Sequence, residues 1–428
     1  MTRNNLLLFL SVMAVISFTW KFLSYYIPWT IVGINVVSVY LWTALFTVIA
    51  IAIHPKILAS KSFLWLYLII ISRLLLQAIR NSRFDFPGLI LGVSDIGIAL
   101  TLYVLYTQYM DIRYQRLFLR VLLFIIAVSM ILSIVGLIRY PEAVRNITSG
   151  AEGEEGIEFY NALGISGYGF FTGLPPLVPV LVFLSRKSKK RSARYFYGTF
   201  LGVLLLSIFL CGITTPLILA LVGLALAILG YNRLRRNNTL LFIILLVLLW
   251  IAIPPDLLVN RVIGGLADLV PNSEVAERLE AINRAAEGEF EVTASSQTMN
   301  AVEARFQRVF WNLDAFIKNP LVGYAGEMPR GSFHLYWLHR LARTGILGTL
   351  PLIGLLVFQF LFNSKKFTSE YKFYYGVGIG LFFAMGMLKA IGGWFTYFVP
   401  YFLVPSLYYL HDTEERACLK TEISREAA

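Results

Sequence analysis

Long apolar runs recur from one end of this chain to the other, and no other feature constrains its fold as strongly. Of the 428 residues, 57% are apolar and only 14% are charged, with a mean hydropathy of +0.69. A run of about 20 apolar residues forms a helix that crosses the hydrocarbon core of a bilayer. The pattern excludes a soluble globule and predicts an all-α integral membrane protein with many spans.

Runs of this length predict about 12 transmembrane helices, with a large polar loop before the tenth. The expected spans are Asn5–Trp20, Thr30–Ile53, Phe63–Ile79, Gly88–Met110, Phe118–Ile138, Gly164–Ser185, Tyr195–Ile213, Thr215–Gly230, Thr239–Ile253, Leu335–Phe362, Lys372–Leu388 and Gly393–Leu410. Residues 1–253 are therefore expected to form a bundle of about nine spans. Residues 254–336 form the loop, and residues 337–428 contain the last three spans and a polar tail. The N-terminal run is expected to be retained as the first helix, because no small-x-small cleavage site follows it.

The distribution of charge predicts an orientation. An even number of spans puts both termini on one side, and the loops on that side contain 21 of the 37 lysines and arginines against seven acidic residues. By the positive-inside rule, both termini are cytoplasmic and loop 254–336 lies on the outer face. The net charge of +12 is then a topology signal. Membrane lipids are expected as partners, and nucleic acid is not.

The outer loop 254–336 is the expected location of any chemistry. It contains seven basic and eleven acidic residues, and its pattern predicts helices at Asn272–Glu289 and Gln297–Lys318, the second ended by Pro320. No nucleotide sugar or ATP is available outside the cytoplasm. A group transfer there needs a donor already carried in the membrane and activated by a group such as a lipid diphosphate. No cofactor is expected, and the four histidines form no metal-ligand set.

His334 is the candidate general base in this loop. Ser332 is a suitable N-cap for the tenth helix, which would place His334 in the first turn of that helix. The helix dipole there disfavours imidazolium, and a neutral imidazole is what proton abstraction from a sugar hydroxyl requires. The alternative is that His334 is only a polar ring at the membrane boundary.

Arginines near the outer rim are candidates for binding a diphosphate, since guanidinium groups bind phosphate oxygens bidentately. Arg73 and Arg80 lie on one face of the third expected span, and Arg139 closes the outer end of the fifth. Two structural roles remain open. Arg73 can form an ion pair with Asp95, and Arg80 and Arg139 can anchor the helices to lipid headgroups.

The spacing of four features in residues 301–348 carries a resemblance to a known family. Arg305 precedes a Pro-Leu-Val-Gly turn at Pro320–Gly323, His334 follows the turn, and a Gly-Ile-Leu-Gly motif occupies Gly345–Gly348. This pattern resembles the shared core of the O-antigen ligase and O-antigen polymerase superfamily of bacterial membrane glycan transferases. The motifs cover about 45 residues of the chain, and the twelve expected spans with a large outer loop extend the resemblance to its architecture.

The resemblance implies a metal-independent, inverting transferase in the bacterial inner membrane, with its site on the periplasmic face. The donor is an undecaprenyl-diphosphate-linked oligosaccharide, and the acceptor is a glycan or lipid A-core. His334 would deprotonate the acceptor hydroxyl. Arginines would neutralise the diphosphate, with Arg305 first and Arg80, Arg139, Arg73 and Arg261 as further candidates.

Two departures from the family pattern bear on the choice between polymerase and ligase. Leu335 stands where the family often has Asn, and Thr214–Pro216 stands where it often has a Ser-Arg pair. Arg80, Arg139 or Arg261 would have to replace that missing arginine. The missing pair favours a repeat-unit polymerase of O-antigen or exopolysaccharide type, with a ligase onto lipid A-core as the alternative. A different class, a polytopic transporter or lipid-linked glycan flippase, also fits the many spans.

Overall fold

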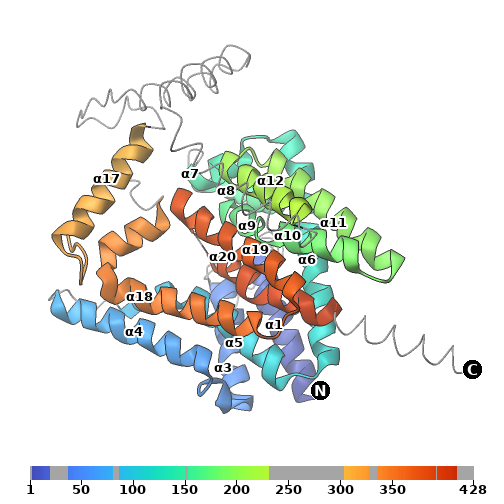
Figure 1. Ribbon diagram of the computed structural model, residues 1–428, viewed down its shortest axis with the longest axis horizontal. Coiled ribbons are helices and arrows are strands. Elements are labelled where there is room, and N and C mark those ends of the chain that lie inside the picture. Colours follow the sequence, from blue (N-terminus) through green and yellow to red (C-terminus); the bar gives the residue numbers. More distant parts are fainter. Residues whose placement is uncertain are drawn as a thin grey trace, which may run out of the picture. The chain divides into compact units, whose positions relative to one another are not determined.

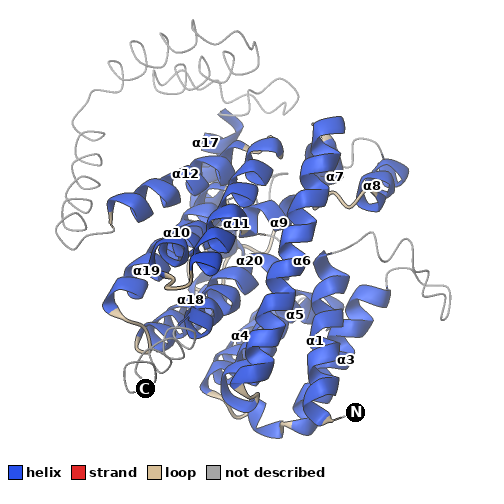
Figure 2. Ribbon diagram, turned by 90° about the vertical axis from the view of Figure 1, so that its right-hand side faces the viewer, coloured by secondary structure: helices blue, strands red, loops and turns tan. Residues whose placement is uncertain are grey.

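The computed structural model describes residues 2–19, 37–80, 86–149, 153–230, 303–326, 335–391 and 393–411. Every element in these ranges is helical (Figure 2). The expected spans that lie in these ranges are found as helices, which confirms the all-α class. The expected ninth span, Thr239–Ile253, and the expected loop helix Asn272–Glu289 lie outside the described residues.

The helices follow one another along the chain with short connections. They are α1 (Arg3–Thr19), α3 (Val37–Ile53), η1 (Pro55–Ile57), α4 (Lys61–Ile79), α5 (Phe86–Val104), η2 (Leu105–Tyr109), α6 (Ile112–Arg139), α7 (Ala143–Ser149), α8 (Gly153–Ala162), α9 (Tyr168–Gly173), α10 (Leu177–Lys187), α11 (Arg191–Leu210), α12 (Thr214–Leu229), α17 (Glu303–Lys318), α18 (Tyr336–Ser364), α19 (Ser369–Leu388), α20 (Trp394–Phe398) and η5 (Val399–Leu403). Both η2 and η5 are π-helical turns that continue an α-helix.

Four of the described helices, α4, α6, α11 and α18, are long and apolar enough to cross a bilayer. Apolar stretches in α1, α3 and α12 are shorter. The chain therefore has the helices of a membrane protein, and the total of twelve spans stays a prediction. Large apolar side chains on these helices point outward, for example Phe124 at 63% and Val135 at 64% exposure on α6. An outer surface of this kind suits contact with lipid tails.

The expected sixth span, Gly164–Ser185, is two helices instead of one. Helix α9 ends at Gly173 and α10 begins at Leu177, with a turn between them that contains Pro175 and Pro176. Proline lacks the backbone N–H that an α-helix needs and its ring clashes with the preceding turn, so two adjacent prolines end the first helix. The expectation of a continuous span was wrong at this point.

The chain divides into two compact units. One contains residues 1–228 and 347–428, and we call it the bundle unit. The other contains residues 229–346, and we call it the loop unit. In the bundle unit, α1 packs against α3 and α6, α6 also contacts α11, and α10 contacts both α11 and α19 (Figure 2).

Helix α4 runs beside the part of α18 that belongs to the bundle unit (Figure 1). The indole of Trp65 lies against Gly354, where an added Cβ would be 2.6 Å from its ring. Its ring centroid is 6.4 Å from that of Phe358, and Ser62 donates a hydrogen bond of 3.1 Å to the side chain of Gln359. A glycine at position 354 thus permits the close approach of the two helices.

Tyrosine side chains fill much of the interior of the bundle unit. Tyr371, Tyr374 and Tyr375 on α19 are fully buried. The hydroxyl of Tyr371 donates a hydrogen bond of 2.6 Å to the backbone carbonyl of Val404. The amide of Asn363 donates to the Tyr375 hydroxyl at 3.4 Å. Hydrogen bonds of this kind offset the cost of burying hydroxyl groups among apolar helices.

Candidate functional site

The two glycine motifs that carry the family resemblance pack directly against each other in the loop unit. Ile346 donates its backbone N–H to the carbonyl of Pro320 at 2.9 Å, and Tyr324 donates to the carbonyl of Ala342 at 2.7 Å. The turn at Pro320–Gly323 therefore lies against the backbone of α18 around Gly345. We refer to Pro320–Tyr324 together with Ala342–Ile346 as the turn–kink segment.

Glycine is required at two positions of the turn–kink segment. A Cβ at Gly323 would lie 2.5 Å from the backbone nitrogen of Gly345, and a Cβ at Gly345 would overlap the carbonyl oxygen of Leu321. Both residues also have positive φ, +74° at Gly323 and +58° at Gly345. Because the two backbones touch, any side chain at either position would separate them.

Gly345 also breaks α18. Its φ of 58° and ψ of −166° are not helical, so α18 consists of two helices joined at a kink. The sequence predicts a continuous tenth span whose first turns project beyond the membrane, and this expectation was wrong. The part from Ile346 to Ser364 is about 28 Å long at 1.5 Å per residue, close to the ~30 Å hydrocarbon core. The preceding part, Tyr336–Thr344, is a separate short helix.

Helix α17 leads into the turn as the sequence predicts. It ends at Lys318, before Pro320, and Gly323 then donates its N–H to the carbonyl of Asn319 at 2.7 Å. One face of α17 is buried, with Asn312 at 1% exposure, while Ile317 on the other face is 73% exposed. The expected helix Gln297–Lys318 is confirmed from Glu303 to its end.

The short helix before the kink presents three basic side chains, His339, Arg340 and Arg343. Arg343 donates to the carbonyl of Gly326 at 3.4 Å. Arg340 donates to the hydroxyl of Tyr336 at 3.1 Å, and its Nε is buried with no hydrogen-bond partner in the described structure. A buried guanidinium N–H of this kind is suited to an anionic ligand. Sequence analysis missed Arg340, although its spacing of four residues from Tyr336 was a usable signal.

The position of His334 relative to α18 differs from the expectation. The helix begins at Tyr336, and Leu335 before it is a bend, so the helix does not extend back to an N-cap at Ser332. His334 and Ser332 themselves lie outside the described residues. His334 thus immediately precedes the short helix in sequence, and its side chain adjoins the end of the described segment. Its role as general base stays a prediction.

The predicted arginines are distributed over both units. Arg305 lies in the first turn of α17, where only its backbone is described, and Arg261 lies outside the described residues. Arg73 and Arg80 are half-buried on or at the end of α4. Arg139, in the last turn of α6, is exposed, with its guanidinium carbon 5.7 Å from the ring centroid of Tyr140. A common diphosphate site for these arginines and His334 stays a prediction.

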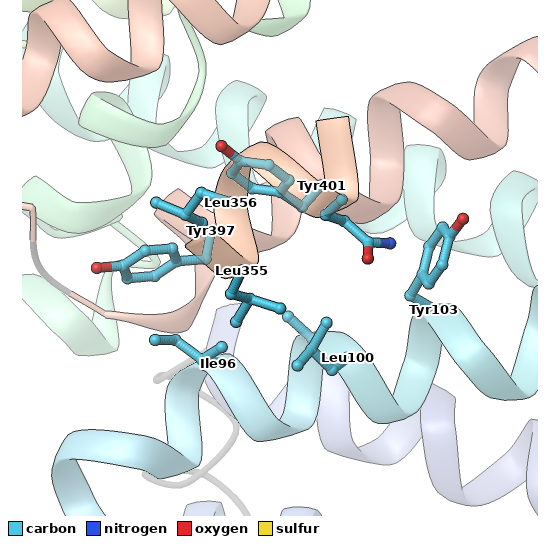
Figure 3. Close-up of a pocket in the computed structure, with 9 residues that line it drawn as sticks. Ile96, Leu100, Tyr103, Leu355, Leu356, Tyr397 and Tyr401 are labelled. Carbon is cyan, nitrogen blue, oxygen red and sulfur yellow. The ribbon is translucent and has the colours of Figure 1, made fainter. Parts of the chain in front are cut away.

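A small cavity inside the bundle unit is a second location that we considered. It is lined by residues of α5, α18, α20 and η5, with Tyr103 and Tyr401 on different helices around it (Figure 3). The hydroxyl of Tyr401 and the Nε2 of Gln359 are buried there without a hydrogen-bond partner. The cavity volume is about 20 Å³, room for one water molecule. It is too small for a diphosphate or a sugar.

No metal-binding group of three or more His, Cys, Asp and Glu side chains occurs within the described ranges. The features above define the class of the chain: an all-helical protein with helices that can span a membrane, and a polar turn–kink segment next to one of them. No family model, no curated protein and no solved structure matches this chain.

Proposed function

We propose that the protein is a membrane glycan transferase that moves an oligosaccharide from undecaprenyl diphosphate to the hydroxyl of an acceptor sugar. The observation that carries the proposal is the backbone contact between Gly323 and Gly345. It unites two motifs, 22 residues apart in the sequence, that the resemblance treats as parts of one site. Both glycines have a physical reason to be there.

The basic side chains beside this contact add chemical support. His339, Arg340 and Arg343 lie on one short helix within the loop unit, directly after His334 in the sequence. A diphosphate carries several negative charges, and arginines neutralise them without taking part in proton transfer. Arg305 is the first candidate for this role, with Arg340 added to Arg80, Arg139, Arg73 and Arg261.

The proposed reaction is a single inverting displacement. The neutral imidazole of His334 accepts the proton of the acceptor hydroxyl, whose oxygen forms a bond to the anomeric carbon of the donor. The bond from that carbon to the diphosphate oxygen breaks, and undecaprenyl diphosphate leaves with the electron pair. Guanidinium groups stabilise the charge that develops on the leaving group. No metal ion enters this scheme.

Within this class, we favour a repeat-unit polymerase over a ligase because no Ser-Arg pair occupies Thr214–Pro216. The two differ in the product of a deletion strain. A strain without a polymerase still attaches single repeats, whereas a strain without a ligase attaches none. The length of the attached glycan on a gel therefore distinguishes them.

A flippase or transporter is the second candidate, and the break between α9 and α10 favours it. Transporters use discontinuous helices near their substrate sites, and Pro175 and Pro176 interrupt an apolar run in that way. Substrate translocation requires no general base. A flippase therefore keeps its activity when His334 is replaced, and a transferase does not.

The test is glycan transfer by His334→Ala, measured in purified protein with a lipid-diphosphate-linked donor. We expect at least a 100-fold loss, in the range typical for removing a general base. The matched control is His339→Ala, a histidine five residues away on the described helix. Unchanged transfer by His334→Ala, at a normal thermal midpoint, would overturn the proposal.

A further inference from the structure

A groove with two cationic side chains lies between α6 and α11 in the bundle unit. Its volume is about 500 Å³. Arg120 of α6 and Lys190, directly before α11, are both exposed and line it together with Ser192. The remaining lining residues are Leu123, Phe124, Ala127, Ala193, Phe196, Tyr197 and Leu410. The groove is thus apolar apart from its basic and hydroxyl groups, and no carboxylate is among its described lining residues.

The two kinds of lining are separated along the helices. Lys190 and Ser192 stand at the beginning of α11, and Phe196 follows one turn further. On α6, Arg120 comes first and Phe124 and Ala127 follow one and two turns later. Phe124 is 63% and Phe196 49% exposed. Both helices are long and apolar enough to span a membrane, so these rings lie where lipid tails would contact them.

We propose that this groove binds an anionic phospholipid, with its phosphate at Arg120 and Lys190 and its acyl chain along Phe124, Ala127 and Phe196. Basic pockets between transmembrane helices are suited to anionic headgroups. A free phosphate would gain nothing from the apolar part of the groove. A volume of about 500 Å³ falls within the range of small-molecule sites. The inference does not depend on the glycan-transfer proposal and holds for either orientation of the chain.

Native mass spectrometry of the full chain in detergent tests the charged part of the groove. Dioleoyl phosphatidylglycerol and dioleoyl phosphatidylcholine differ only in headgroup, and we expect the anionic lipid to be retained preferentially. Each basic side chain near an anionic headgroup contributes about fivefold to affinity, so Arg120→Gln with Lys190→Gln should weaken phosphatidylglycerol binding by about 25-fold. The control is Arg113→Gln with Lys189→Gln, two exposed cations nearby that do not line the groove.

A second variant tests the apolar part without changing charge. Ala127 lines the groove and is half-buried, so Ala127→Trp should fill the space for the acyl chain and reduce phosphatidylglycerol binding severalfold. Competition by water-soluble glycerol 3-phosphate distinguishes a lipid site from a free-anion site. Equal losses in the two double variants would mean attraction by general surface charge. Either that result or full displacement by glycerol 3-phosphate would overturn the proposal.

Discussion

The bundle unit and the turn–kink segment are held together in opposite ways. In the bundle unit, large side chains fill the interior, and Tyr371 alone lies within about 5 Å of three other rings, those of Phe183, Phe367 and Tyr408. In the turn–kink segment, contact depends on the absence of side chains at Gly323 and Gly345. Side-chain packing tolerates small changes, whereas backbone contact does not. The segment proposed to do chemistry is therefore the more sensitive of the two to the smallest substitutions.

This comparison predicts that adding a methyl group to Gly345 has the largest effect of any small change. Gly345→Ala would place a Cβ on the carbonyl of Leu321 and force an alanine into a backbone conformation that essentially only glycine adopts. We expect a loss of about 3 kcal/mol in stability and loss of glycan transfer. The thermal midpoint in detergent and the transfer assay measure both.

The matched control for this substitution is Gly376→Ala in the middle of α19. A Cβ there meets no atom within 4 Å, and alanine is the better helix former by about 1 kcal/mol. Its stability should stay the same or rise. If Gly345→Ala behaved like this control, the backbone contact would not be what holds the turn–kink segment together.

A smaller effect is expected when the bundle interior loses one polar atom without losing volume. Tyr371→Phe removes the hydroxyl that donates to the carbonyl of Val404 and keeps the ring between its aromatic neighbours. We expect a cost of about 1 kcal/mol and unchanged glycan transfer. Tyr195→Phe, at a tyrosine 62% exposed on α11, should cost almost nothing. Loss of transfer in Tyr371→Phe at normal stability would contradict this separation of the two regions.

The smallest expected effect is a pH dependence from His54, which lies between α3 and η1 with its ring stacked on Tyr109 at 5.0 Å. Burial, and secondarily the charge of Arg3, hold the pKa of His54 below its ordinary value of 6.5. The unfolded chain therefore binds a proton more readily than the folded one. The contribution of His54 is fully present above about pH 6.5 and falls as the pH drops through the lowered pKa.

Thermal midpoints at pH 7.5 and pH 5 measure this contribution. His54→Gln should reduce the difference between the two midpoints, because glutamine does not titrate. An equal difference in wild type and variant would assign the pH dependence to other groups. Since His54 belongs to the bundle unit, the effect should appear in the thermal midpoint and leave the turn–kink segment unaffected.

The sequence was sufficient to predict most of the helices, because an apolar run of membrane length is a simple signal. Helix α6 and the end of α17 at Lys318 were found where they were expected. The break at Pro175 and Pro176 was foreseeable from proline chemistry. Helices α7 and α8, in a segment rich in glutamate and glycine, were not predicted, because they are too short for a clear apolar period.

The site was predictable as a set of residues and not as a geometry. The motif spacing identified the turn at Pro320–Gly323 and the glycine at position 345, but no pattern showed that their backbones touch. Backbone contact depends on the path of the chain through space, and glycine has several reasons to occur in a membrane helix. The half-buried position of Arg340 likewise depends on how α18 begins, which the sequence placed too early.

The hydrogen bond from Ile346 to Pro320 has a consequence for how the apolar part of α18 meets the lipid. A helix leaves its first amide protons without partners inside the helix, and hydrocarbon offers none. Here the carbonyl of Pro320 accepts the proton of Ile346, the first residue after the kink. That amide should exchange with deuterium slowly although it sits at a helix start. The turn thus seals an end that would otherwise need water.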